Sequence, residues 1–319
     1  MLRAVARASV PTVSATRHTG VMTYSIVARD PATGEIGVAV QSHWFSVGSV
    51  VVTGLAGVGA IATQASPNLS FKHRGLEMLR DGMTAAEASL ALRQDDPAIE
   101  HRQFAIVDAY GGAVAFTGSA CMGEAGQYSG DGYTCQANMM RNDTVWATMA
   151  RAFEQAGGSF SSRLLAALDA AQGAGGDLRG QQSAAILVVP ASGTPSDTVV
   201  DLRVEDHPTP LVELRRLVTL GGAYRLADEG DDLVASGDFS TAASRYVAAN
   251  ALAPDNDELR FWAGLGLISA GVPDRGVELL RASIASDASW HELLTRLDPS
   301  DVPSSGEALR LLGESDSIR

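Results

Sequence analysis

The sequence predicts an α+β fold in which two stacked sheets lie between helical layers, a four-layer αββα sandwich, followed by an all-α extension of helical hairpins. Strand signals come in groups and helix signals in pairs, an order that suits stacked sheets better than a parallel sheet of alternating strands and helices. After residue 207 strand signals stop and an alanine- and leucine-rich region begins. A chain of 319 residues can form two domains.

The first 21 residues, MLRAVARASVPTVSATRHTGV, contain three arginines and no acidic residue. This composition resembles a transit-type leader, and it lacks the apolar core of a secretory signal. Three interpretations stay open: a disordered extension, a propeptide removed during maturation, or a misassigned start, with translation beginning at Met22. We favour the third interpretation.

Residues 24–29 and 36–41 predict two strands rich in β-branched residues, joined by a glycine-containing turn. Thr23 precedes the first strand and follows Met22, and a methionine before a small residue can be removed by a processing peptidase. Removal would leave a threonine whose hydroxyl and α-amine, of pKa about 7.7–8.0, could act together in amide hydrolysis. The alternative is an ordinary strand threonine. Ser25, on the same face of the strand, is a second candidate nucleophile without a free amine.

Residues 47–62 are apolar and glycine-rich, and they predict one or two buried strands. The glycines do not match a dinucleotide-binding loop. The polar segment 63–68 then places Gln64 and Asn68 at a strand-to-helix junction, where amides and backbone N–H groups can bind an oxyanion; a plain turn is the alternative. Helices are expected at 71–80 and from Thr84, which forms a capping box with Glu87.

The remaining elements of the first domain follow in order. They are strands at 104–107 and 114–117, a glycine-rich loop at 121–132, a strand at 133–140, helices at 145–155 and 161–172, and a buried strand at 183–189.

Charged and metal-binding residue types give weaker signals. Arg102 and Glu100 lie just before a strand, where they could bind a carboxylate substrate or form an exposed ion pair. The histidines at 43, 73 and 101 lack metal-ligand spacing, so no metal and no cofactor are expected. Cys121 and Cys135 are expected to be buried structural thiols, because no basic partner is evident.

Charge and composition exclude several classes of partner. The formal net charge is −13, which argues against nucleic acid and against an anionic membrane surface. No apolar run approaches the roughly 20 residues that span a bilayer. Two cysteines are too few for a disulfide-dense secreted scaffold, so a cytoplasmic location is expected.

Four long motifs resemble a known family. They are TYSIVARDPATGEIGVAV, GVGAIATQASPN, HRQFAIVDAYGGAVAFTGSAC, and GGDLRGQQSAAILVV followed by RVEDHPTPLVELRRL. Together they closely resemble domain of unknown function 1028, a family placed in the N-terminal nucleophile (Ntn) hydrolase superfamily. The resemblance covers residues 22–220 and implies an Ntn-hydrolase-like αββα domain, which we expect at 22–204.

The superfamily resemblance also implies roles for single residues. Thr23 falls at the position of the nucleophile. Gln41 or Ser42 falls where proteasome-like subunits have a bracing aspartate, and neither is a carboxylate. Asp177 falls near a second supporting aspartate, and residues 136–138 fall near a serine loop. The lysine of proteasome-like subunits has no counterpart, because residues 50–62 contain none.

Residues 205–298 contain a repeat of 34 residues that resembles the tetratricopeptide repeat. Gly230, Gly237, Ala242, Tyr246 and Pro254 are followed at that spacing by Gly264, Gly271, Gly276, Leu280 and Ala288. Two such units are fewer than the three or so repeats that usually form a stable fold by themselves. We therefore expect them to dock on the catalytic domain or on a partner. Residues 224–290 would form a partner groove or a cap over apolar surface. The polar tail 299–319 is expected to fray around a short helix at 307–312.

Two functional hypotheses follow. In the first, the chain is an amidohydrolase: Thr23 attacks a carbonyl, its amine transfers the proton, and backbone N–H groups with Asn68 or Asn138 hold the oxyanion. The substrate would be a small amide or a short peptide, and the resemblance implies a homo-oligomer. In the second, the chain is a non-catalytic module that recruits a partner through the repeat. The expected site residues are, for catalysis, Thr23, Ser25, Asn68, Asn138 and Asp177, and for substrate binding Gln41, Ser42, Gln64 and Arg102.

Overall fold

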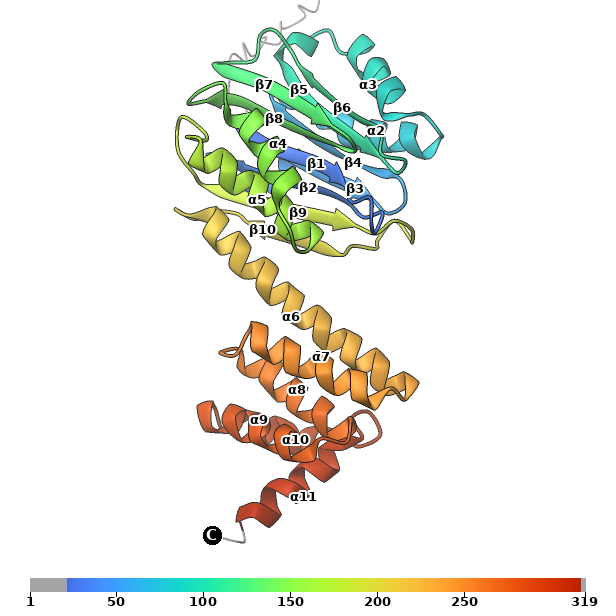
Figure 1. Cartoon of the computed structure of the whole chain (residues 1–319), viewed down its shortest axis with the longest axis vertical. Helices are drawn as coiled ribbons and strands as arrows, with labels where there is room; N and C mark the ends of the chain where they lie inside the picture. The colour runs from blue at the N-terminus through green and yellow to red at the C-terminus, as the bar shows by residue number, and fades with distance from the viewer. Residues whose placement is uncertain (1–21, 317–319) are drawn as a thin grey trace, which may run out of the picture. The chain divides into compact units, whose positions relative to one another are not determined.

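The structure is a computed structural model that describes residues 22–316, so the leader at 1–21 lies outside the described residues. Contacts divide the chain into two compact units (Figure 1). The first unit runs to Val199 and includes Glu205–Pro208. The second unit contains Val200–Val204 and the chain from Thr209 onward.

The first unit is a mixed α/β domain. Its strands are β1 (Thr23–Arg29), β2 (Ile36–Ser42), β3 (Val52–Leu55), β4 (Gly59–Ala65), β5 (Arg102–Asp108), β6 (Ala113–Thr117), β7 (Glu124–Gly130), β8 (Tyr133–Met140) and β9 (Ser183–Val189). Its helices are α1 (Val47–Val51), α2 (Ser70–Arg80), α3 (Ala85–Gln94), the 3₁₀ turn η1 (Ile99–His101), α4 (Val145–Gln155) and α5 (Phe160–Gly173).

The strands form two antiparallel sheets that pack face to face. Among the described residues of the first unit, the larger sheet has the order β9-β2-β1-β8-β7 and the smaller has the order β3-β4-β5-β6. A further strand, β10 (Val200–Val204), belongs to the second unit. Helices α4 and α5 cover the outer face of the larger sheet, and α2 and α3 cover that of the smaller (Figure 1). The predicted grouping of strands and pairing of helices is therefore confirmed.

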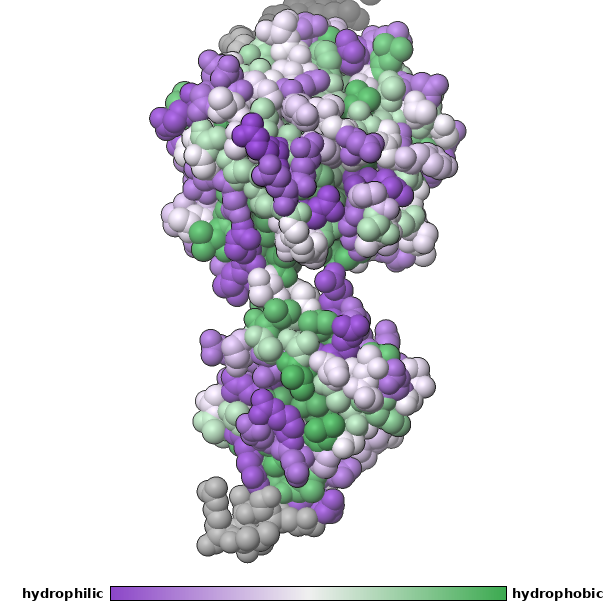
Figure 2. Space-filling view, in the orientation of Figure 1, coloured by the Kyte–Doolittle hydropathy of each residue, from purple (hydrophilic) through white to green (hydrophobic). Residues whose placement is uncertain are grey.

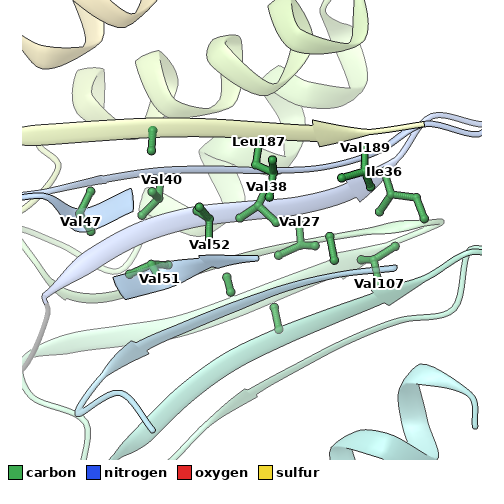
Figure 3. Close-up of a cluster of buried hydrophobic side chains, with 14 residues drawn as sticks. Val27, Ile36, Val38, Val40, Val47, Val51, Val52, Val107, Leu187 and Val189 are labelled. Atoms are coloured by element: carbon green, nitrogen blue, oxygen red, sulfur yellow. The ribbon is translucent and has the colours of Figure 1, made fainter. Parts of the chain in front are cut away.

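Side-chain alternation along β1 explains the layers. The Tyr24 hydroxyl donates a hydrogen bond to Gln172 of α5, on the helix side. Ser25 instead contacts Gln64 of β4 in the opposite sheet. Val27, two residues further on, joins the apolar core between the sheets, with Val38, Val107 and other small β-branched or aliphatic side chains (Figure 3). Burial of these side chains holds the sheets together.

Three element predictions before residue 205 were wrong or incomplete, and one local prediction is confirmed. Residues 47–51 form helix α1 instead of a strand, because Ser46 adopts a left-handed conformation and Val47 and Val51 bury one helical face. The predicted loop at 121–132 contains the strand β7, whose sequence EAGQYSG lacks β-branched residues. Strand β10 was not predicted. The capping box of Thr84 and Glu87 is confirmed at the start of α3.

Toward the start of β1, the layer between the sheets changes from aliphatic side chains to amides. Gln64 follows Ala60 and Ala62 on the inner face of β4, and Gln103 precedes Ala105 and Val107 on the inner face of β5. The Gln64 amide donates to the Gln103 side-chain oxygen at 2.7 Å. We call the buried set Ser25, Gln64, Gln103, Gln136 and Asn138 the amide network.

Each member of the amide network has several partners. Ser25 donates to Gln64 at 2.7 Å and accepts from Gln136 at 2.6 Å. Asn138 donates to Gln103 at 2.9 Å. The Gln103 amide also donates to the Thr117 hydroxyl at 2.8 Å and to the Ala137 carbonyl at 2.9 Å. Because every member is neutral and bonded, the network avoids the cost of burying unpaired polar groups.

Apart from β10, the regular structure described in the second unit is helical. Its helices are α6 (Pro210–Ser236), α7 (Phe239–Leu252), α8 (Asp257–Ser269), α9 (Pro273–Ser286), α10 (Ser289–Arg296) and α11 (Ser304–Asp316). Within the described residues, none of the helices combines the length and the hydropathy that a transmembrane segment requires.

The 34-residue spacing recurs in the contacts of this unit. A Cβ at Gly230 would lie 2.7 Å from the ring of Tyr246, and one at Gly264 would lie 2.9 Å from Cγ of Leu280. These pairs join α6 to α7 and α8 to α9 at equivalent positions. Gly237 and Gly271 end the first helix of each pair, with φ of 85° and 79°, a conformation that glycine adopts readily.

The tail expected to fray contains helix α11, which packs on the unit. Ala308 and Leu312 are buried in one cluster with Phe261, Leu265 and Leu294. The sequence from 299 looked polar because these apolar positions are spaced widely around exposed residues. The helices α10 and α11 thus bury the end of the two-hairpin array.

The amide network yields a stability prediction. The Gln103→Leu variant should lose about 3 kcal/mol of unfolding free energy, since it leaves buried donors and acceptors unpaired. Denaturant unfolding measures this, and exposed Gln94→Leu should stay within about 0.5 kcal/mol of wild type. In Gln103→Glu, burial should raise the pKa of the new carboxyl, so that variant should lose stability as pH rises above about 4. A Gln103→Leu variant as stable as wild type would contradict this account.

The helical hairpins yield a second prediction. A Cβ at Gly276 would lie 2.5 Å from the backbone oxygen of Gly264, so Gly276→Ala should push α8 and α9 apart and cost about 1–3 kcal/mol. Gly222, inside α6, has no atom within 4 Å of its Cβ position. Gly222→Ala should therefore stabilise the same unit by up to about 1 kcal/mol through helix propensity. Thermal unfolding followed by helical circular dichroism tests the pair, and equal effects would refute the close contact.

Candidate functional site

Several strand ends meet around Thr23 because neighbouring strands are antiparallel. Thr23, the first residue of β1, lies opposite Ser42, the last residue of β2. Ser42 in turn lies opposite Ser183, the first residue of β9. The end of β8 flanks β1 on its other side, with Ala137 opposite Tyr24. The loops that leave these strand ends therefore gather at one end of the sandwich.

The peptide unit that joins Met22 to Thr23 is held by two side chains. The Ser42 hydroxyl donates to the Met22 carbonyl oxygen at 2.5 Å. The Nη2 atom of Arg179 donates to the same oxygen at 3.0 Å. Ser42 can reach it because it is the cross-strand neighbour of Thr23. One carbonyl oxygen thus receives a neutral and a cationic donor.

Asp177 holds Arg179 in place. Its carboxylate is buried and accepts from Arg179 Nη2 at 2.9 Å and from Arg179 Nε at 3.1 Å, a two-point pairing. It also accepts from the backbone N–H of His43 at 3.1 Å. Burial, and secondarily the charge of Asp177, raise the pKa of the Tyr24 hydroxyl, so Tyr24 stays neutral beside this ion pair.

The amide network holds Thr23 from the side of the opposite sheet. The Thr23 carbonyl oxygen accepts from the Gln64 amide at 3.3 Å and from the Asn138 amide at 3.5 Å. Thr23 itself is fully buried. Its backbone is therefore fixed from two directions, by the amides at its own carbonyl and by Ser42 and Arg179 at the carbonyl before it.

Left-handed residues follow both of these amides. Ala65, directly after Gln64, has φ of 61°, and Met139, directly after Asn138, has φ of 55°. Such a conformation costs a non-glycine residue of order 1–3 kcal/mol and clusters at functional sites. Both left-handed residues therefore lie directly beside an amide that reaches the Thr23 carbonyl.

The structure brings together several of the site residues predicted from sequence. Ser42 contacts the Met22–Thr23 peptide unit directly, and Asp177 acts on it through Arg179. Ser25, Gln64 and Asn138 lie in the amide network on the side of the opposite sheet. The Ser25 hydroxyl donates to one amide and accepts from another. These bonds make it a structural member of the network.

Gln41 lies on the other face of β2. It is the cross-strand neighbour of Tyr24, which contacts α5, so alternation directs Gln41 toward the helix layer and away from Thr23. Its side chain is buried, and neither polar atom of its amide has a hydrogen-bond partner among the described residues. Of the two positions that the resemblance left open, Ser42 is the one that faces Thr23.

Asn68 and Arg102 form a separate cluster with Asp96. The Asn68 amide donates to the Asp96 carboxylate at 2.8 Å, and Arg102 Nε donates to it at 3.0 Å. Arg102 precedes Gln103 on β5 and so faces away from the amide network. In the described residues Arg102 pairs with Asp96 and not with Glu100. The Glu100 carboxylate instead accepts hydrogen bonds from the backbone N–H and the hydroxyl of Ser119.

The charge state of Asp96 reflects this cluster. Burial alone would raise the pKa of its carboxyl, but hydrogen bonds from Asn68, the Ala98 N–H and Arg102 outweigh burial and lower it. The carboxylate therefore anchors the turn between β4 and α2. The Asn68 amide that we expected at an oxyanion is engaged here.

The cysteines lie in unreactive surroundings. The pKa of the Cys121 thiol is raised to about 11, mainly by burial. The thiol also donates a hydrogen bond to the Arg102 carbonyl. Cys135 is fully buried in β8, and burial raises the pKa of its thiol as well. In the part of the chain that the structure describes, no group of three His, Cys, Asp or Glu side chains is placed to hold a metal ion.

Sequence reasoning missed two residues of this arrangement. Arg179 lies in the motif GGDLRGQQ, and only its spacing of two residues from Asp177, which allows a two-point pairing, marks it in the sequence. Gln103 gave no signal, because a single glutamine at the start of a strand is common. Gln103 reaches the amides of the other sheet only because β5 packs against β8 in the folded domain.

Comparisons with known proteins cover the first unit. The family described as a family of unknown function (DUF1028) matches residues 23–214. No curated protein matches the chain. A DUF1028 protein of Silicibacter pomeroyi has a crystal structure that is 36% identical, with a TM-score of 0.57 over 62% of this chain and 88% of that one.

A second solved structure is more distant. The Anbu protein (ancestral beta-subunit) of Yersinia bercovieri is 12% identical, with a TM-score of 0.30 over 61% of this chain and 92% of that one. This similarity is too low to support an argument. The match to DUF1028 instead spans more than half of the chain and begins at Thr23. The chain belongs to the DUF1028 family, a family of unknown function.

Proposed function

We propose that this chain is an amidohydrolase of the N-terminal nucleophile type, with the αββα sandwich as its catalytic fold and Thr23 as its nucleophile. One observation carries the proposal: the carbonyl directly before Thr23 accepts hydrogen bonds from Ser42 and Arg179. The threonine hydroxyl, its backbone nitrogen and two carbonyl-binding donors thus belong to one small region. The start of the family match at Thr23 supports the same boundary.

The proposed reaction begins once the residue before Thr23 has been removed. The neutral α-amine accepts the proton of the Thr23 hydroxyl, which attacks the amide carbonyl of the substrate. Ser42 and Arg179 stabilise the oxyanion, as they now hold the Met22 carbonyl oxygen. The ammonium returns the proton to the leaving amine, and water then hydrolyses the acyl-enzyme ester. Asp177 acts by positioning Arg179.

The helical unit favours a second candidate function, that of a partner-binding module. An open cavity of about 620 Å³ lies between α6 and the turn from α7 to α8, lined by Val212, Leu220, Leu252 and Pro254 with Arg215 and Arg216. Figure 2 shows hydrophobic side chains gathered on the visible face of this unit. We propose that this tetratricopeptide-like unit, including residues 224–290, binds a protein partner.

We also propose that the chain forms a homo-oligomer. Light scattering that finds a monomer at micromolar concentration would refute the oligomer.

The first test is the identity of the mature N-terminus. Intact-mass spectrometry of the full reading frame, expressed in its native host, should give a chain that begins at Thr23. An electrophile selective for N-terminal threonine should label that chain and not Thr23→Ala. Because the amine must be neutral to act, the labelling rate should rise with pH and level off above about 8. A chain that keeps Met22, with no labelling, would rule out the proposal and leave the binding module.

The second test concerns the carbonyl donors. Arg179→Ala should lower kcat toward an amide substrate by about 10²–10³, the usual loss for an oxyanion donor, with a smaller change in KM. Arg179→Lys should recover part of kcat, since it keeps the charge without the two-point pairing. Exposed Arg151→Ala in α4 is the matched control and should keep full activity. An unchanged kcat in Arg179→Ala would exclude its role as a donor.

A further inference from the structure

The loops around the Met22–Thr23 peptide unit expose large apolar side chains. Phe45 is 64% exposed, Leu69 54%, Met122 39% and Leu178 52%. They come from four loops, those between β2 and α1, β4 and α2, β6 and β7, and α5 and β9. We call these four residues the apolar rim. Large apolar side chains that are exposed on neighbouring loops favour a binding surface.

The backbones of two members of the apolar rim are both hydrogen-bonded to Met139 near the end of β8. The Met139 N–H donates to the Met122 carbonyl at 2.9 Å, and the Leu178 N–H donates to the Met139 carbonyl at 3.2 Å. The loops of Met122 and Leu178 are thus joined through one residue. Leu178 also lies between Asp177 and Arg179 in sequence, next to the groups that hold the Met22 carbonyl.

The other two members are connected to the site and to each other through α1 and α2. Phe45 follows His43, whose N–H donates to Asp177. Leu69 precedes α2, and the Lys72 ammonium of α2 donates to the Ser49 carbonyl of α1 at 3.0 Å. This bond joins the loop of Leu69 to the segment that follows Phe45. The four loops of the apolar rim are therefore connected to one another and to Asp177, which holds the donor Arg179.

The chain itself places an apolar acyl group at these donors. The carbonyl that Ser42 and Arg179 bind belongs to Met22, a half-buried residue with a long unbranched side chain. The Arg179 charge is paired with Asp177 and directed at the carbonyl oxygen, so it does not offer a second anion site for an acidic acyl group. We propose that the substrate is an amide whose acyl group is apolar and of the size of a methionyl or leucyl residue. This inference rests on the proposed function.

The test compares aminoacyl coumarylamides that differ only in the acyl group, with the mature enzyme that begins at Thr23. The methionyl and leucyl substrates should exceed the glutamyl and lysyl substrates at least tenfold in kcat/KM. Leu178→Ser should lower kcat/KM for the methionyl substrate about tenfold, mostly through KM, because it removes apolar contact area. Leu90→Ser is the matched control: Leu90 of α3 is 53% exposed and lies outside the rim, and this variant should keep full activity.

Binding without turnover separates this inference from the proposed function. In the Thr23→Ala variant of the mature chain, calorimetry should show tighter binding of methionine amide than of glutamate amide, and Leu178→Ser should abolish the difference. Turnover of amides without an apolar preference would overturn the inference and leave the proposed function standing. Failure of every amide to react, together with the expected binding preference, would overturn the hydrolase and support apolar recognition. Equal binding of the two amides would overturn the inference in either case.

Discussion

The buried amide network between the two sheets is the constraint on which the site depends. Its members come from both sheets, and each makes at least one side-chain hydrogen bond to a member on another strand. A slip of one residue in any of these strands would turn an amide into the helix layer and leave its partners unpaired. The network therefore fixes the relative register of β1, β4, β5 and β8. It also determines where the first residue of β1 lies.

Charge enters this neutral frame from one loop. The loop after α5 supplies Asp177 and Arg179, and the carboxylate holds the guanidinium by two hydrogen bonds against the Met22 carbonyl. The neutral amides therefore bind the Thr23 carbonyl, and the charged Arg179 of the loop binds the Met22 carbonyl. Left-handed Ala65 and Met139 directly follow the two amides that bind the Thr23 carbonyl, so backbone strain occurs at the same end of the sandwich.

Most of the secondary structure followed from local patterns. The strands at 36–42 and 183–189 and the cap of α3 could be predicted because β-branched runs and a capping box act within a few residues. Helix α1 and strand β7 were missed because packing overrides local preference there. An apolar valine run fits a buried strand or a buried helical turn equally well, and β7 gains its structure from pairing with β8. Helix α11 was underestimated because its apolar residues acquire a partner surface only in the folded helical unit.

The sequence alone determined the family motifs, most of the strands and helices, the 34-residue spacing and the position of Thr23 at the start of a strand, since these are properties of contiguous residues. The tertiary structure decided which polar groups meet. It turned Ser42 toward Thr23 and Gln41 away from it, engaged the Asn68 amide with Asp96, and brought Arg179 to the Met22 carbonyl across more than 150 residues. The physical reason is that a hydrogen bond depends on the side of the strand and on the neighbour across the sheets. Both are settled only when the strands pair and the sheets stack.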